Sequence, residues 1–167
     1  AQVEKVLECN ELVGQIAEEI KEANDIFYLG RGVDYSLAME GALKIKEISY
    51  VHAEAFAAGE LKHGSIALID KGTPVVAIAT QGKLFEKMVS NMQEVRARGA
   101  RVIAITQEGN TEVEKSADRV IYIPKVDDMF ASITAVVPMQ LLAYHASNIR
   151  GLDVDKPRNL AKSVTVE

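Results

Sequence analysis

The sequence contains little cysteine and histidine, and this scarcity excludes two classes of protein. Cys9 is the single cysteine, and the histidines are His52, His63 and His145. One cysteine cannot form a disulfide within the chain, and one thiol with three histidines offers little for a Cys/His metal cluster. We therefore expect a protein of the reducing cytoplasm that holds no metal.

The sequence also lacks an excess of positive charge and a long apolar run. Lys and Arg number 19 against 24 Asp and Glu, which gives a net charge of −5 and disfavours a nucleic-acid partner. The most apolar stretch, 131–146, is interrupted by Pro138 and two polar residues and is too short to cross a bilayer. No basic segment followed by an apolar one opens the chain. We predict neither a nucleic-acid partner nor a membrane span.

The composition is that of one folded domain. Apolar residues make up 48% and charged residues 26% of the 167 residues, which is the balance and length of a single globular unit. Residues 153–167 show no sustained periodicity. We expect a domain over residues 1–152 and a C-terminal tail over 153–167 that covers the active site.

Short apolar runs alternate with helical patterns along the chain. Strands are predicted at 26–29, 74–79, 101–106 and 119–123, the last three buried on both faces, and 53–57 could add a short strand. Helices are predicted at 3–23, 35–50, 84–98 and 128–149, where Pro138 should kink or divide the last one. This alternation predicts an α/β fold with a doubly wound parallel sheet between helices.

The first turn from strand to helix is where a parallel α/β sheet most often binds ligands. Here it contains Gly30, Arg31 and Gly32, but Tyr35 stands where a dinucleotide-binding turn has its third glycine, so NAD is disfavoured. No phosphate-binding GxxxxGK[ST] string occurs. The glycines either let backbone approach a ligand or a neighbouring loop, or only permit the tight turn.

Two groups of polar residues could carry chemistry. Glu40, Lys44 and Glu47 share one face of the helix that leaves this turn, either as a solvated ion-pair stripe or as a proton shuttle near the presumed site. His63 lies in a polar loop flanked by glycines, which is a common setting for an active histidine.

The other candidates have weaker grounds. His145 is expected in the core or an interface, and His52 has no assignment. Cys9 has no basic neighbour placed to activate it, so a nucleophilic role is not expected.

Several strings resemble one protein family over nearly the whole chain. They are LGRG (29–32), EGALKIKEISYVHAE (40–54), GELKHG (59–64) and DVDKPRNLAKSVTVE (153–167). They resemble the C-terminal sugar-isomerase (SIS) lobe of the isomerising glutamine–fructose-6-phosphate aminotransferases, the glucosamine-6-phosphate synthases. The resemblance implies a flavodoxin-like sheet of five parallel strands flanked by helices.

The resemblance also implies a reaction and its residues. The resemblance implies that the open-chain ketose imine, formed from fructose 6-phosphate and glutamine-derived ammonia, is converted into glucosamine 6-phosphate by moving a proton between C1 and C2, without pyridoxal phosphate. By position, Glu47 is the base, Lys44 assists it, and His63 opens the sugar ring from the neighbouring subunit of a homodimer. Lys162 forms an imine with the sugar, and the backbone at Ala161 contacts the sugar.

The chain departs from the family's full pattern. It carries no glutaminase domain and no first SIS lobe, whose Ser/Thr-rich loop holds the sugar phosphate in the family, so we expect these as partners and little activity from the chain alone. A non-catalytic phosphosugar-binding module is the alternative. Glu47, His63, Lys44 and Lys162 together favour the catalyst, and a sugar-amine deglycase would be expected to lose the NLAKSVTVE end.

Overall fold

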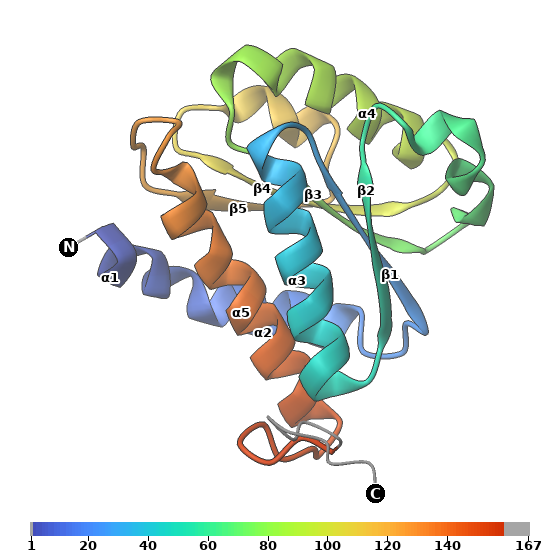
Figure 1. Cartoon of the computed structure of the whole chain (residues 1–167), viewed down its shortest axis with the longest axis vertical. Helices are drawn as coiled ribbons and strands as arrows, with labels where there is room; N and C mark the ends of the chain where they lie inside the picture. The colour runs from blue at the N-terminus through green and yellow to red at the C-terminus, as the bar shows by residue number, and fades with distance from the viewer. Residues whose placement is uncertain (1, 159–167) are drawn as a thin grey trace, which may run out of the picture.

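Five parallel strands form the centre of the computed structural model, which describes residues 2–158 (Figure 1). The sheet order is β2-β1-β3-β4-β5. The strands are β1 (Asp25–Gly30), β2 (His52–Ala57), β3 (Pro74–Ala79), β4 (Arg101–Gln107) and β5 (Arg119–Ile123). This order confirms the predicted flavodoxin-like fold, including the short strand at 53–57, and the winding reverses between β1 and β3.

Within residues 2–158, five α-helices connect and cover the strands: α1 (Gln2–Val6), α2 (Asn10–Glu19), α3 (Val33–Ser49), α4 (Phe85–Ala97) and α5 (Ala131–Ile149). A 3₁₀ turn, η1 (Leu7–Cys9), separates α1 from α2 within the first predicted helix. Pro138 lies inside α5, which remains one undivided helix packed against both α2 and α3. Of the two predicted effects of Pro138, a kink or a division, the division is therefore wrong, because packing along the helix compensates for the bond that proline removes.

Successive residues of the inner strands pack into two separate apolar cores. Tyr28 of β1 and Ile78 of β3 lie in the core shared with α2, α3 and α5. Phe27 and Ala77, their neighbours in sequence, lie in the core shared with α4. Burial on both faces explains the continuous apolar runs of β3 and β4. The same prediction is wrong for β5, an edge strand on which Arg119 is exposed.

The chain after α5 turns back toward the end of α3 (Figure 1). Arg158, the last residue described, contacts Tyr50 just after α3. Lys162 and Ala161 lie outside the described residues, as does most of the predicted tail. Within residues 2–158, no helix has both the length and the apolar character needed to cross a membrane.

Candidate functional site

The turn after β1 is filled by its own backbone. A Cβ atom on Gly30 would lie 2.2 Å from the carbonyl oxygen of Asp34, in the first turn of α3, and Gly32 has a φ of +58°. Gly30 is therefore required by the close return of the chain over itself, and Gly32 by its positive φ and by Leu84 of η4 (Gly82–Leu84), which would lie 3.1 Å from a Cβ. The structure thus supports a tight turn at Gly30 and close approach to a neighbouring loop at Gly32.

Asp34 ties this turn to the loop after β3. Its side chain is buried, with 2% exposed, and one carboxylate oxygen accepts the backbone N–H of Thr80 at 2.8 Å. The other oxygen accepts the Thr80 hydroxyl at 2.6 Å. Burial raises the pKa of Asp34, and the hydrogen bonds from Thr80 oppose that rise. The carboxylate is thus used internally, as a link between two loops.

The same polar network continues across the carboxyl ends of β3 and β4. Gln107 donates to the carbonyl of Thr80 at 2.9 Å and to the carboxylate of Asp128 at 3.2 Å. Asp128 also accepts the backbone N–H of Gly82 at 2.8 Å. The strand ends where the fold type most often binds ligands are therefore bonded to one another and to the segment before α5.

Lys44 and Glu47 form a hydrogen-bonded ion pair on α3. The Lys44 ammonium is 2.8 Å from a carboxylate oxygen of Glu47 and 3.6 Å from one of Glu40. The Lys44 and Glu47 side chains are 34% and 26% exposed, so the pair is partly shielded from water. The hydrogen bond to Glu47 raises the pKa of Lys44, which keeps this lysine charged at neutral pH. Lys44 can hold the carboxylate in one orientation but is poorly suited to attack a carbonyl.

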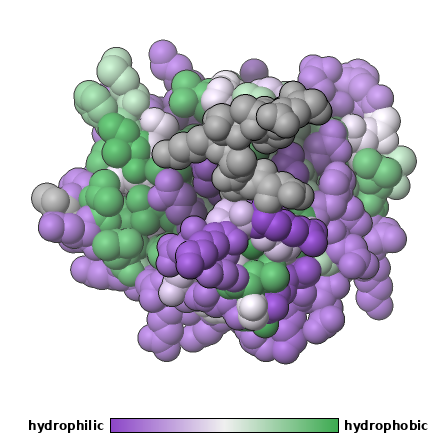
Figure 2. Space-filling model, turned by 60° about the horizontal axis from the view of Figure 1, so that its bottom comes forward, coloured by the Kyte–Doolittle hydropathy of each residue, from purple (hydrophilic) through white to green (hydrophobic). Residues whose placement is uncertain are grey.

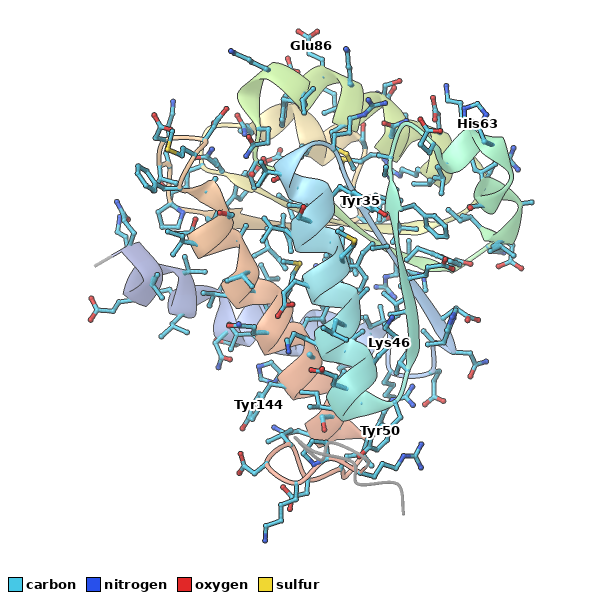
Figure 3. All side chains as sticks on the ribbon, in the orientation of Figure 1. Tyr35, Lys46, Tyr50, His63, Glu86 and Tyr144 are labelled. Atoms are coloured by element: carbon cyan, nitrogen blue, oxygen red, sulfur yellow. The ribbon has the colours of Figure 1, made fainter. Side chains whose placement is uncertain are left out.

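This pair lies at the end of α3 that is remote from the glycine turn. Glu47 is in the last turn of a 17-residue helix, a length of about 25 Å. Figure 3 shows Tyr35 near one end of α3 and Lys46 and Tyr50 toward the other. The prediction that the pair lies near the carboxyl ends of the strands is therefore wrong. The pair forms a separate site on the surface.

His63 lies at the end of the domain opposite to Lys46 and Tyr50, which flank Glu47 in sequence (Figure 3). It belongs to η2 (Leu61–His63), which follows β2, and its side chain is 74% exposed. Its ring is 3.8 Å from the carboxylate of Glu60, too long for a hydrogen bond. Within one chain, the structure does not bring Glu47 and His63 together.

Tyr50 and Arg158 form a contact that no motif of the sequence predicts. The backbone N–H of Arg158 donates to the Tyr50 hydroxyl at 2.8 Å, and the guanidinium carbon is 4.0 Å from the centre of the ring. Tyr50 belongs to the family string at 40–54, and the resemblance assigns it no role. The predicted helix over 35–50 includes Tyr50, whereas α3 ends at Ser49, so the sequence held no signal for this contact.

The remaining candidates have structural partners. His52 pairs with Asp25, its neighbour across β1 and β2, at 2.7 Å on the surface. His145 bonds Asn10 at 2.9 Å and so links α5 to α2. Burial raises the pKa of the Cys9 thiol, which disfavours the reactive thiolate. Among residues 2–158, no group of three His, Cys, Asp or Glu side chains could hold a metal ion.

Comparisons with known proteins agree with the fold and the motifs. The family model of the SIS domain matches residues 19–150. The chain is 58% identical over 164 residues to the isomerising glutamine–fructose-6-phosphate aminotransferase of Clostridium acetobutylicum, and 59% identical over 165 residues to that of Thermus thermophilus. These alignments cover 98% and 99% of this chain but only 27% of either relative.

A solved structure of a related domain also resembles this chain over nearly its whole length. It is the C-terminal domain of the glucosamine-fructose-6-phosphate aminotransferase from Francisella tularensis, with a TM-score of 0.88 and 42% identity. The match covers 94% of this chain and 44% of that one. The chain thus corresponds to slightly more than a quarter of the curated relatives and to less than half of this solved domain.

Proposed function

Because the chain belongs to the SIS domain family and is homologous to the C-terminal isomerase lobe of the isomerising glutamine–fructose-6-phosphate aminotransferases, we propose that it serves as that lobe in a longer enzyme. The proposed reaction converts fructose 6-phosphate and ammonia derived from glutamine into glucosamine 6-phosphate. The observation that carries this proposal is the partly buried Lys44–Glu47 pair in the last turn of α3.

The pair suits a ketose-to-aldose isomerisation. Such a reaction needs one base that removes a proton from C1 of the sugar and returns it to C2, and a single carboxylate beside the substrate can do both. Glu47 is held for this task by the hydrogen bond from Lys44. The charged Lys44 also supports the negative charge that develops on the sugar as the proton leaves.

Lys162 is the proposed partner of the sugar carbonyl, with the backbone at Ala161 in contact with the sugar. An uncharged amine is required to form an imine, and Lys44 is kept charged by Glu47. The described part of the tail ends at Arg158, four positions before Lys162, against the end of α3 that carries Glu47. This location supports a joint role for Lys162 and Glu47 in one site.

His63 is proposed to open the sugar ring in the site of a neighbouring subunit. An imidazole titrates near neutral pH and can move the proton that ring opening requires. The exposure of His63, and its location beyond the end of β2 that is remote from Glu47, support a contribution to another subunit of a homodimer.

The rest of the enzyme is proposed to cover an apolar face. Several large apolar side chains are exposed on α3, on α5 and just before α5: Met39, Leu43, Met129, Phe130 and Ile133. Figure 2 shows apolar side chains gathered on the side of the molecule that carries α1 and α5. The relatives are nearly four times as long, so we assign this face to the preceding SIS lobe, which with the glutaminase domain would complete the enzyme.

The phosphate anchor is also proposed to lie on that preceding lobe. In the present chain, the donors of Thr80 are already bonded to Asp34. This internal bonding leaves no free anion site there and supports an anchor elsewhere.

The proposal is tested on the complete enzyme with fructose 6-phosphate and glutamine, without added pyridoxal phosphate. We expect glucosamine 6-phosphate to form, and we expect the isolated chain to form little or none. Binding of fructose 6-phosphate without turnover by the complete enzyme would contradict the proposal and favour a non-catalytic phosphosugar-binding module.

A further inference from the structure

Tyr50 has a backbone conformation that its residue type seldom adopts. It follows α3 directly with φ 59° and ψ 17°, in the left-handed region. Among residues 2–158 it is the only residue other than glycine with a positive φ. Glycine is the usual residue at such a helix end, because a Cβ atom makes this conformation unfavourable. A tyrosine here indicates that its side chain supplies something that glycine could not.

The Tyr50 side chain contacts the beginning of the tail in two ways. Its hydroxyl accepts the backbone N–H of Arg158 at 2.8 Å, and its ring lies 4.0 Å from the Arg158 guanidinium carbon, a cation–π distance. One contact fixes the backbone of Arg158 and the other fixes its side chain. Together they set both the position and the direction of the chain at this residue.

The other hydrogen bonds of the described tail are local. The backbone N–H groups of Asp155 and Lys156 donate to Asp153 at 2.9 and 3.3 Å. Over the described stretch 153–158, Tyr50 therefore provides the hydrogen bond that ties the tail to the body of the domain.

We propose that Tyr50 is a positioning residue, which holds the described start of the tail, 153–158, against the end of α3 that carries Glu47. The catalytic consequence rests on the proposed function, because Lys162 follows Arg158 by four positions and must meet the sugar that Glu47 deprotonates. Tyr50 acts through Arg158 and takes no part in proton transfer.

The first test replaces Tyr50 with glycine in the complete enzyme. Glycine suits the left-handed backbone, so we expect a melting temperature close to that of the wild type. The kcat for glucosamine 6-phosphate formation should fall on the order of 10-fold to 100-fold, since a small misplacement of a reacting group has this effect. Glutamine hydrolysis should be retained. Arg158→Ala, at an exposed position, should lower the same kcat without affecting folding.

The second test needs no catalytic activity. The bond after Arg158 is a trypsin site, whereas the bond after Lys156 precedes Pro157 and resists trypsin. Release of the guanidinium in Tyr50→Gly should accelerate cleavage after Arg158, measured by mass spectrometry of the native protein during digestion. Tyr122→Phe is the matched control, because it removes a 2.6 Å hydrogen bond from a tyrosine to Glu114 that is far from the tail in sequence.

The outcomes separate this proposal from the proposed function. Faster cleavage in Tyr50→Gly, with wild-type enzyme that forms no glucosamine 6-phosphate, would support the anchor and overturn the function. Wild-type cleavage and wild-type kcat in Tyr50→Gly would overturn the anchor. A loss of melting temperature and glutamine hydrolysis in Tyr50→Gly, with normal kcat in Arg158→Ala, would also overturn it, since Tyr50 would then serve the fold alone.

Discussion

Glu47 and His63 lie at opposite ends of the domain. Glu47 is in the last turn of α3, which leads into the beginning of β2, and His63 follows the other end of β2. If both residues act on one sugar, they must come from different subunits, as a symmetric dimer allows.

Subunit mixing tests this arrangement. Complete His63→Ala and Glu47→Gln enzymes should each be inactive in isomerisation, and heterodimers should regain part of the activity because one of their two sites receives both intact residues. The measurement is glucosamine 6-phosphate formation after exchange of differently tagged subunits. Confirmed exchange without recovered activity would place His63 outside the site of the neighbouring subunit.

Asp34 should matter for stability. Asp34→Ala leaves the buried N–H and hydroxyl of Thr80 without their acceptor, so we expect the free energy of unfolding to fall by about 2 to 4 kcal/mol. Denaturant unfolding of the isolated domain measures this change in the free energy of unfolding. Asp70→Ala is the matched control, because Asp70 accepts the Thr73 hydroxyl at 2.9 Å on the surface and should change little. Equal effects of the two substitutions would contradict a structural role specific to Asp34.

Glu19 should make stability depend on pH. Its carboxylate accepts hydrogen bonds from Arg101 and Arg119. The hydrogen bond from Arg119 is the main reason why the pKa of Glu19 lies below its ordinary value of 4.5. A lowered folded pKa adds stability above the unfolded pKa, and this stability is lost as pH falls through the folded value. At pH 7 the wild type should therefore have a higher melting temperature than Glu19→Gln. The difference between the two melting temperatures should disappear as the pH falls below about 4.5. A difference that is independent of pH would contradict the pairing.

The sequence predicted the regular elements better than the contacts between distant segments. The strands are apolar runs between turn residues, and their alternation with helices leads directly to a parallel sheet. Asp34 and Thr80 are 46 positions apart, so no local sequence pattern predicts the hydrogen bond between them. Parallel α/β sheets usually bind ligands at the carboxyl ends of their strands, which is where α3 begins. The family motif containing Lys44 and Glu47 lies where α3 ends, and only the structure shows that these two places are far apart. Likewise, the left-handed backbone of Tyr50 cannot be read from its residue type.

Lys44 and Lys162 should differ in their reactivity toward the sugar. Borohydride with fructose 6-phosphate should trap the sugar on Lys162 of the complete enzyme, because reduction of an imine gives an amine that cannot hydrolyse. Lys44 should remain unmodified, since Glu47 keeps it charged. Mass spectrometry of the digested protein locates the adduct. A sugar on Lys44 or Lys46, with none on Lys162, would overturn the role proposed for the tail.

The most direct measurement compares Glu47→Gln with Glu40→Gln in the complete enzyme. Both remove one negative charge beside Lys44 and keep the shape of the side chain, but Glu40 lies 3.6 Å from the ammonium and has no proposed role in proton transfer. We predict that Glu47→Gln lowers the rate of glucosamine 6-phosphate formation by about 100-fold or more, with glutamine hydrolysis retained, and that Glu40→Gln stays near the wild-type rate. A Glu47→Gln enzyme that isomerises fructose 6-phosphate as fast as Glu40→Gln would show that Glu47 is only a charge on the surface of α3.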